Sequence, residues 1–354
     1  MRRRGAAINP ANRFQPFRLH VDGDWLDEEH DPGRPPRRVP LKVYPDATRR
    51  VIHRVVATSD VPFDWTLNPY RGCEHGCVYC YARPFHEYLG FSAGLDFETK
   101  LVAKHDAPDL LRRELASSTW RGEPIVMSAI TDVYQPIEAK LGIVRRCLEV
   151  LAEAGQPVST MTKGALVLRD LDLWQRLAQH NAGRVTVTLV TLDDQLAKSL
   201  EPRAASPARR LRMIRELSDA GVEVAVNVAP VIPGLTDFEV PAILEAVADH
   251  GATSASWVLL RLPYQLKAIF LDWMERELHP SRARRVESRL RQARNGKLYD
   301  ASTRWDPQGP ISRQIGDSFN LFCRRYKLNA ERRPLDNQHF RPPTLPGAQL
   351  ALFR

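Results

Sequence analysis

The sequence predicts an α/β fold: a partial (β/α)6 TIM-like barrel with an N-terminal extension and an α-helical C-terminal region. Three observations predict it. Short runs of apolar and β-branched residues alternate with segments of helical periodicity, which is typical of parallel βαβ units. About six such repeats are found, too few for a complete eightfold barrel. The chain has 354 residues, 43% of them hydrophobic, so it can bury a core of this size.

Two of the expected strands have a clear composition, since the run at 125–127 is apolar and the run at 185–190 is rich in β-branched residues. The run at 125–127 follows Gly122-Glu123-Pro124, and Gly221 comes directly after a helical pattern that it is expected to end. An open doubly wound sheet would show the same alternation, and this alternative stays open. In chain order, the expected strands are 64–68, 125–127, 157–162, 185–190, 222–228 and 256–260, and the helices between them are 142–153, 171–179, 207–220 and 240–250.

Composition divides the chain into four segments. Residues 1–60 are rich in Arg, Pro and Asp and lack sustained periodicity, so we expect an extended N-terminal segment there. Residues 61–270 form the expected barrel, and residues 271–330 the α-helical region. Residues 331–354 are expected to be a disordered tail.

The cysteines indicate an intracellular metal or redox site. Three of the five, Cys73, Cys77 and Cys80, fall within eight residues, while Cys147 and Cys323 are isolated in apolar surroundings typical of a core. An odd count with one tight cluster is unlike a secreted disulfide framework. No signal peptide is evident at the N-terminus, and no uncharged apolar run approaches the roughly 18 residues of a membrane span. We therefore expect a cytoplasmic protein with no membrane partner.

The spacing C-x3-C-x2-C suits a soft metal centre. Thiolates at these intervals can converge, and Gly72 and Gly76 let the backbone fold around the metal. Three thiolates leave one corner of a four-iron cluster open for another ligand. The alternative is a structural zinc site completed by His75 or His86, although the sequence lacks the second cysteine pair that such sites generally use.

The motif, with an aromatic residue directly before its last cysteine, resembles the radical S-adenosylmethionine (radical SAM) superfamily. The stretch NPYRGCEHGCVYCYARPFHEYLG is similar to the branch related to spore photoproduct lyase, the DNA repair photolyase-like proteins. Further segments resemble this branch in the expected order over about residues 60–330. They are TDVYQPIEAK, MTKGALVLRDLDL, TLDDQLAKSLEPRAASPARRLRMIRELSDAGVEV and APVIPGLTD.

The resemblance implies cofactors and a reaction. A [4Fe–4S] cluster on Cys73, Cys77 and Cys80 would bind S-adenosylmethionine at its open iron. One electron, from a donor such as flavodoxin or ferredoxin, would cleave the sulfonium. The resulting 5′-deoxyadenosyl radical would take a hydrogen atom from a substrate.

The resemblance also implies contacts to S-adenosylmethionine. Its methionine amino group would meet residues after the second strand, its carboxylate would meet residues ending the third and fourth strands, and its adenine would lie beside the cysteine loop and the fifth strand. Each position also has an ordinary structural interpretation: loop packing, a turn or cap, a surface lysine, or a strand residue. The expected contacts are Tyr79, Thr131, Asp132, Lys163, Thr188 and Ala229, with Ser128 near them.

One position departs from the photoproduct lyases. Those enzymes use an additional cysteine as hydrogen donor, and Ala129 occupies the matching place here. This departure weakens the case for spore photoproduct repair as the reaction. A tyrosine such as Tyr134 is an alternative donor.

Positive charge is concentrated at the C-terminus. The net charge is +9, and residues 279–354 contain 16 basic and 6 acidic residues. A run of arginines from Arg282 to Arg294 falls on a candidate helix, which is either a phosphate-binding surface or a solvated face. The leading hypothesis is therefore a radical SAM enzyme whose substrate is unknown, with nucleic acid as the foremost candidate. The alternative is a non-catalytic, metal-binding protein that binds nucleic acid.

Overall fold

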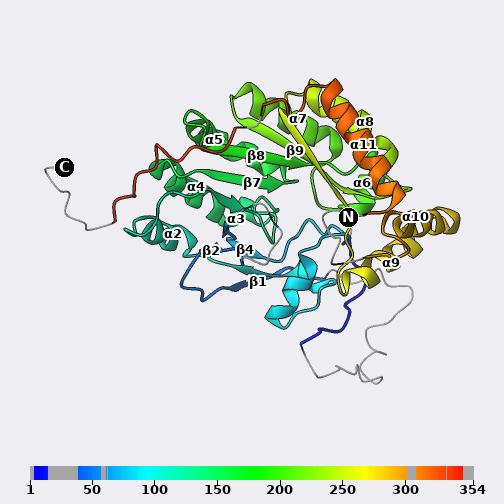
Figure 1. Ribbon diagram of the computed structural model, residues 1–354. Helices are drawn as coiled ribbons and strands as arrows, with labels where there is room; N and C mark the ends of the chain where they lie inside the picture. The colour runs from blue at the N-terminus through cyan, green and yellow to red at the C-terminus, as the bar shows by residue number, and fades with distance from the viewer. Residues whose placement is uncertain are drawn as a thin grey trace, which may run out of the picture.

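The computed structural model describes residues 4–14, 39–56, 61, 63–299, 301, 308–331 and 333–345. Its main feature is a seven-stranded sheet in the order β10-β9-β8-β7-β6-β3-β2 (Figure 1). Six neighbouring strands are parallel, and β2 (Ile52–Arg54) adds antiparallel to one edge. The parallel strands are β3 (Trp65–Leu67), β6 (Ile125–Met127), β7 (Val158–Thr162), β8 (Gly183–Thr188), β9 (Glu223–Val231) and β10 (Ser254–Leu259).

This sheet confirms the predicted partial barrel. Within the described ranges the edge strands β2 and β10 do not pair with each other, so the barrel is open. The expected strand at 125–127 matches β6, and the bounds of the others differ from the observed ones by at most three residues. The β-branched runs form the core, as Val185, Val187 and Val224 are fully buried.

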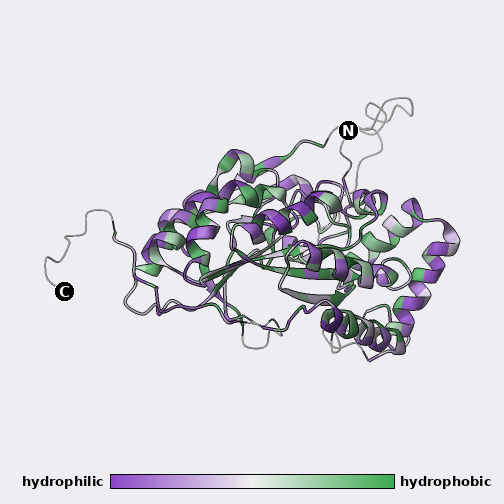
Figure 2. Cartoon of the chain, turned by 90° about the horizontal axis from the view of Figure 1, so that it is seen from above, coloured by the Kyte–Doolittle hydropathy of each residue, from purple (hydrophilic) through white to green (hydrophobic). Residues whose placement is uncertain are grey.

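The helices between the strands are also those expected, within one residue at each end. They are α4 (Ile143–Ala154), α5 (Leu171–Ala178), α7 (Pro207–Asp219) and α8 (Val240–Asp249), and a further short helix, α6 (Asp194–Leu200), precedes α7. Ser206 caps α7, because its side chain accepts a hydrogen bond from the Arg209 amide, and Pro207 occupies the first turn. Figure 2 shows hydrophobic and hydrophilic residues alternating along the helices, as expected for helices with one buried side.

A small second sheet was not expected from the sequence. It pairs β1 (Lys42–Pro45), β5 (Lys100–Ala103) and β4 (Tyr70–Arg71). In the chain, the 3-10 helix η2 (Arg83–Leu89) and the short helix α1 (Asp96–Thr99) come between β4 and β5, and the longer α2 (Ala107–Leu115) follows β5 and packs against α4. All four residues of β1 are exposed, so the strand carries no alternating pattern that could reveal it.

Three helices follow the barrel, in the region expected to be helical. They are α9 (Leu266–Glu277), α10 (Pro280–Ala293) and α11 (Pro310–Arg325). Figure 1 shows α9 and α10 together at the end of the molecule beyond β9 and β10, whereas α11 lies beside α8. None of the described helices has the length and apolar composition required to cross a membrane.

Part of the segment expected as a tail lies on the barrel. The Arg341 amide donates to the Ala154 carbonyl at 2.8 Å, and the Asp336 amide to the Asn181 carbonyl at 3.0 Å. The Phe340 ring lies so close to Gly122 that a Cβ there would be 2.7 Å from the ring. Residues 333–345 therefore follow the ends of the barrel helices.

Candidate metal and cofactor site

The cysteine loop follows β3, at the edge of the sheet where the parallel strands end. Cys73 and Cys77 are each 6% exposed, Cys80 is half-buried, and all three thiols are free. Gly72 and Gly76 have φ of +78° and +70°, a region that favours glycine. The Cys73 amide donates to the Phe97 carbonyl at 2.9 Å. One short loop thus brings three thiols into a dry site at the carboxyl edge of the strands.

The donor set fits an iron–sulfur cluster. Burial raises the pKa of Cys73 well above its usual value and that of Cys77 to about 12, although Lys163 partly offsets this for Cys77. The thiols therefore need a strong Lewis acid to lose their protons here. Among the described residues, no three His, Cys, Asp or Glu side chains are placed to hold a single metal ion. A cluster imposes a different requirement, since each thiolate binds a different iron.

The histidines that could complete a zinc site have other neighbours. His75 Nδ1 lies 3.1 Å from Asp132 Oδ2. The buried His86 ring packs against the rings of Phe91 and Phe97, with centroids 5.2 Å and 5.5 Å away. Burial lowers the pKa of His86 to about 4, so this imidazole is neutral.

Thr131 holds the cysteine loop in place. Its hydroxyl donates to the Gly72 carbonyl at 2.7 Å, and Gln135 Nε2 donates to the same oxygen at 3.2 Å. The Glu74 amide in turn donates to Gln135 Oε1 at 2.8 Å. The structure therefore places Thr131 beside the cysteine loop, and its expected contact with S-adenosylmethionine stays a prediction. It adds Gln135, which the sequence analysis did not single out.

Asp132 joins the loop after β6 to the end of β7. Its carboxylate accepts hydrogen bonds from the Thr162 hydroxyl and the Lys163 amide, both at 2.8 Å, and from the Tyr134 amide at 3.0 Å. Burial alone would raise the pKa of Asp132, but His75 and Lys163 lower it more, to about 2. The group is therefore a fixed negative charge beside the cysteine loop.

Replacing Asp132 with Asn should cost about 2 kcal/mol of unfolding free energy at neutral pH. The pKa of this carboxyl is depressed from 3.8 to about 2 in the folded chain, so its contribution is present above pH 3.8 and is lost as the pH falls toward 2. The difference between Asp132→Asn and wild type should therefore shrink from pH 7 to pH 3 in urea titrations of iron-free protein. A difference that does not change with pH would contradict this account of the carboxylate.

Lys163 and Tyr79 face each other across the site, above a buried ion pair. The ammonium nitrogen of Lys163 lies 5.9 Å from the centroid of the Tyr79 ring. The Tyr79 hydroxyl donates to Glu201, which also forms an ion pair with Arg210. Burial lowers the pKa of Lys163, but Cys77, Glu201 and Asp132 raise it more, so that the pKa lies above its usual value. Lys163 is thus a cation beside the cysteine loop.

The buried pair Glu201–Arg210 was not predicted. Arg210 donates to the Thr188 carbonyl at 3.0 Å and to the Ala205 carbonyl at 2.9 Å, so it joins the end of β8 to the loop before α7. Arg203, Arg209 and Arg210 all lie in one segment that resembles the lyase branch, and the sequence alone does not tell whether they face the site or solvent. Their partners differ, since Arg203 pairs with Glu74 and Arg209 with Glu216 on the surface.

Thr188 and Ala229 end two neighbouring strands. Thr188 is the last residue of β8, and its buried hydroxyl oxygen has no hydrogen-bond partner among the described residues. A buried hydroxyl without a partner is uncommon, so it is available to a bound ligand. Ala229 lies near the end of β9 and is joined to Pro230 by a cis peptide bond.

Tyr134 and the two isolated cysteines are buried in the main core, and Ser128 forms a hydrogen bond to β7. The Tyr134 ring is buried, and its hydroxyl accepts a hydrogen bond from the Trp174 indole at 3.0 Å. Cys147 and Cys323 are buried in the main core. Ser128, with φ of +83°, pairs its hydroxyl with that of Thr160 at 2.9 Å.

Tyr81 is an aromatic residue at the site that the sequence analysis missed. Its hydroxyl donates to the Ala129 carbonyl at 2.5 Å, and the Arg261 guanidinium lies 5.0 Å from its ring centroid. The side chain is 42% exposed, so it lies at the open edge of the site rather than in the core. In the sequence, its position directly after the last cysteine is the feature that could have indicated a place at the site.

Fold and site together define a radical SAM protein, and the sequence model of the Radical SAM superfamily matches residues 67–247. The chain belongs to this superfamily. An uncharacterized protein of Mycobacterium tuberculosis (strain H37Rv) is 37% identical over 234 residues, which is 66% of this chain and 68% of the relative. A protein of Pseudomonas phage M6 named radical SAM Nalpha-GlyT isomerase is 24% identical over 219 residues, 61% of this chain and 43% of its own length.

Solved structures show the same fold. A mutant of spore photoproduct lyase with bound AdoMet and dinucleoside spore photoproduct superposes with a TM-score of 0.57 at 15% identity. The match covers 81% of this chain and 79% of that one. At this identity the likeness shows the fold alone, and it agrees with the open parallel barrel described above.

Proposed function

We propose that this chain is an enzyme that binds a [4Fe–4S] cluster at Cys73, Cys77 and Cys80 and cleaves S-adenosylmethionine reductively. The observation that carries the proposal is the position of three free thiols beside an ionised carboxylate, Asp132, and a cation, Lys163. When bound, the cluster supplies the electron that converts S-adenosylmethionine into methionine and a 5′-deoxyadenosyl radical, which takes a hydrogen atom from the substrate.

The surrounding residues would bind and orient the methionine part of the cofactor. Lys163 and the unpartnered Thr188 hydroxyl suit its carboxylate, because one is cationic and the other has a free donor. Thr131 and Asp132 suit its ammonium group, since both offer oxygen atoms at the same edge of the sheet. Tyr79 and the backbone at Ala229 would contact the adenine.

Anaerobic reconstitution with iron and sulfide tests this function. The expected protein acquires the visible absorption of an iron–sulfur cluster and, with dithionite as electron source, forms 5′-deoxyadenosine from S-adenosylmethionine. Flavodoxin or ferredoxin would take the place of dithionite in the cell. A protein that binds zinc tightly and forms neither cluster nor 5′-deoxyadenosine would support the non-catalytic alternative.

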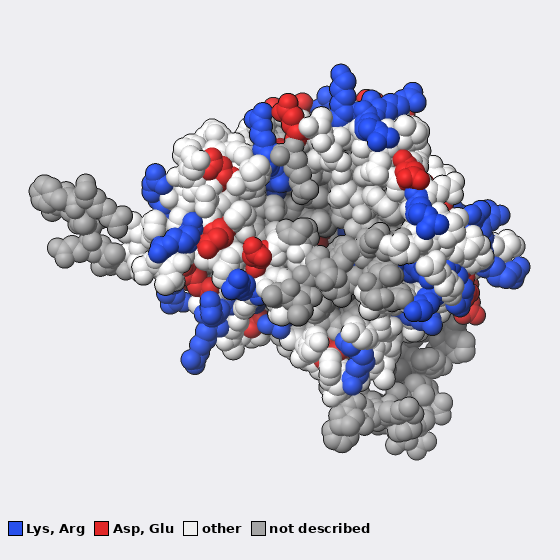
Figure 3. Space-filling view, in the orientation of Figure 1, with Lys and Arg blue, Asp and Glu red and all other residues white. Residues whose placement is uncertain are grey.

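We further propose a nucleic acid as the substrate class, on account of the basic face of α10. Arg285 and Arg289 are exposed and lie against Gly234, in the loop that follows β9 at the site edge of the barrel. Figure 3 shows basic side chains gathered at the end of the molecule where α10 lies. Arg282 and Arg284 are exposed as well, and none of these four arginines has an acidic partner within the described part of the chain.

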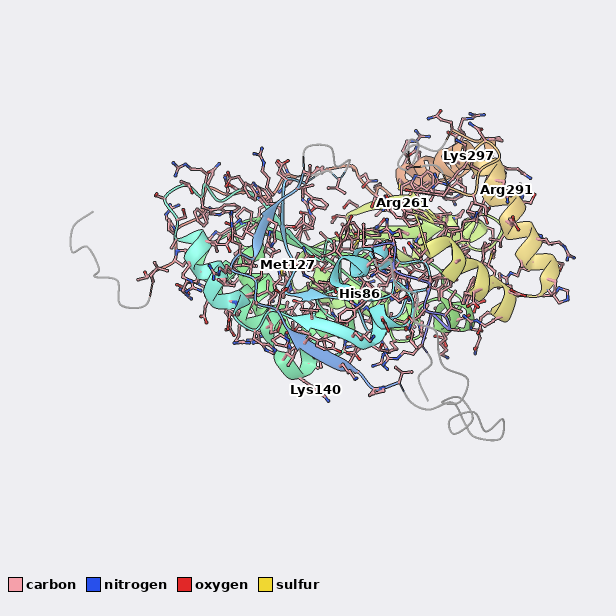
Figure 4. The ribbon with its side chains drawn as sticks, turned by 90° about the horizontal axis from the view of Figure 1, so that it is seen from below. His86, Met127, Lys140, Arg261, Arg291 and Lys297 are labelled. Atoms are coloured by element: carbon pink, nitrogen blue, oxygen red, sulfur yellow. The ribbon has the colours of Figure 1, made fainter. Side chains whose placement is uncertain are left out.

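Two other arginines of this region have partners within the protein. Arg291 pairs with Glu287 at 2.8 Å, and Arg294, expected on the exposed face, is 2% exposed and donates to the Leu260 carbonyl. In the view of Figure 4, Arg291, Lys297 and Arg261 are labelled on one side of the molecule, and Met127 lies nearer its middle. One compared structure, that of spore photoproduct lyase, holds a dinucleoside photoproduct, which is in keeping with this proposal.

The double variant Arg285→Gln/Arg289→Gln should bind DNA roughly tenfold more weakly and lower the salt dependence of binding by about two phosphate contacts. Arg146→Gln/Arg176→Gln is a matched control, because both arginines are exposed on the helices α4 and α5. Fluorescence anisotropy with single-stranded and duplex oligonucleotides at several salt concentrations measures both effects. Equal binding of DNA by the two double variants would contradict the nucleic-acid proposal. It would not bear on the proposed cleavage of S-adenosylmethionine.

A further inference from the structure

Residues 4–14, called here the N-terminal arm, lie against the segment that follows the cysteine loop. The Ile8 carbonyl accepts a hydrogen bond from the Leu95 amide at 3.2 Å, and the Pro10 carbonyl one from the Ser92 hydroxyl at 2.8 Å. Further along, Arg13 pairs with the buried carboxylate of Glu87 at 2.7 Å. The arm is therefore bound along its length, far from its neighbours in sequence.

The arm comes closest to the barrel at the cysteine loop itself. Gly5 is buried, and a Cβ there would lie 1.7 Å from the carbonyl oxygen of Gly76. No side chain can occupy that space without moving one of the two backbones. Gly76 directly precedes Cys77, so the arm contacts the backbone beside a proposed cluster ligand.

A buried carboxylate connects the arm to the same cysteine. Glu98 is fully buried and accepts hydrogen bonds from the amides of Gly5 and Ala6, at 3.0 Å and 2.8 Å. It also pairs with the fully buried Arg83 at 2.6 Å, and Arg83 Nε donates to the Cys77 carbonyl at 2.8 Å. Charge-assisted hydrogen bonds thus run from the arm through Glu98 and Arg83 to Cys77.

We propose that the N-terminal arm is a clamp that positions the cysteine loop around the cluster and shields it from water and oxygen. This inference rests on the proposed function, since it supposes a cluster at Cys73, Cys77 and Cys80. A loop with two glycines at positive φ has little stiffness of its own, so contacts from outside must hold it. Without the arm, the Glu98 carboxylate would lose two of its three hydrogen-bond donors. Arg83 would then be held less firmly in its orientation toward Cys77.

Two substitutions in the arm test the clamp without altering the barrel. Gly5→Ala adds the Cβ that meets Gly76, and Ala6→Pro removes the amide that donates to Glu98. Ala7→Ser is the matched control, because Ala7 is the next residue of the arm and its side chain is exposed. Circular dichroism of all three variants verifies that the barrel remains folded.

Two measurements report how firmly the cysteine loop is held. Hydrogen–deuterium exchange of residues 71–82 in iron-free protein should be roughly tenfold faster in Gly5→Ala and Ala6→Pro than in wild type, as expected when the contact of the arm with Gly76 or one of its hydrogen bonds to Glu98 is lost. The visible absorption of the reconstituted protein should bleach in air faster by a similar factor. Ala7→Ser should match wild type in both.

The outcomes separate the clamp from the proposed function. Folded Gly5→Ala and Ala6→Pro proteins that exchange and bleach as slowly as wild type would overturn the clamp. A wild-type protein that takes up no cluster would overturn the proposed function instead, and the exchange measurement would still decide whether the arm holds the loop.

Discussion

Cys77→Ala should abolish both cluster uptake and the formation of 5′-deoxyadenosine. Cys77 is the central ligand of the three, and its backbone is fixed by the buried Arg83 and by the Glu98 network. Two thiolates cannot hold a four-iron cluster whose fourth corner must stay open for S-adenosylmethionine. Iron and sulfide content, visible absorption and product formation with dithionite would each fall to background.

Cys147→Ala is the control for this variant. Cys147 is as deeply buried as Cys77 but lies on α4 in the main core, away from the site. Its loss should cost about 1 kcal/mol of stability through the cavity that it leaves, with cluster content unchanged. A Cys77→Ala protein that still cleaves S-adenosylmethionine, or a Cys147→Ala protein that does not, would show that the cysteine loop has been misassigned.

The barrel could be predicted because its signals are local. β6 is an apolar run that follows Gly122-Glu123-Pro124, and Gly221 ends α7 where the helical pattern stops. The small sheet could not be predicted in the same way. β4 has two residues, and its pairing of Tyr70 with Ala103 joins segments that lie far apart in the sequence. Short strands with exposed faces leave no periodicity to detect.

At the site, residue type and position in the sequence were enough to predict only some of the groups. The cysteines follow a strict spacing, and Lys163 directly follows a buried strand, so both could be identified. Arg209 and Arg210 look equivalent in the sequence, yet one lies on the surface and the other pairs with the buried Glu201. Burial of a charge depends on contacts distant in sequence, which composition and spacing do not report.

Arg294 illustrates the same limit on the basic region. It belongs to the run of arginines that begins at Arg282, and the net charge counts all of them equally. In the structure α10 ends at Ala293, and Arg294 turns inward to the Leu260 carbonyl. The phosphate-binding surface that we propose is therefore smaller than the charge count implies, and it is centred on Arg285 and Arg289.

Lys163→Met should weaken the binding of S-adenosylmethionine roughly 10- to 100-fold, the range expected when a hydrogen bond to a charged group is lost. The pKa of Lys163 lies above its usual value, so the wild-type side chain carries its charge throughout the neutral range. It stands beside Cys77 and faces Tyr79, where a carboxylate of the cofactor can reach it. Calorimetric titration of the oxidised, reconstituted protein measures the effect directly.

Lys140→Met makes the same chemical change on the exposed end of α3 (Glu138–Leu141) and should bind S-adenosylmethionine like wild type. Iron content separates two roles for Lys163. Within the described part of the chain, the Lys163 ammonium makes no hydrogen bond to the cysteine loop, so its loss should leave iron content unchanged while affinity falls. If affinity and iron content fell together, Lys163 would stabilise the loop through its charge, and the carboxylate contact would have to be assigned to Thr188 or Arg210 instead.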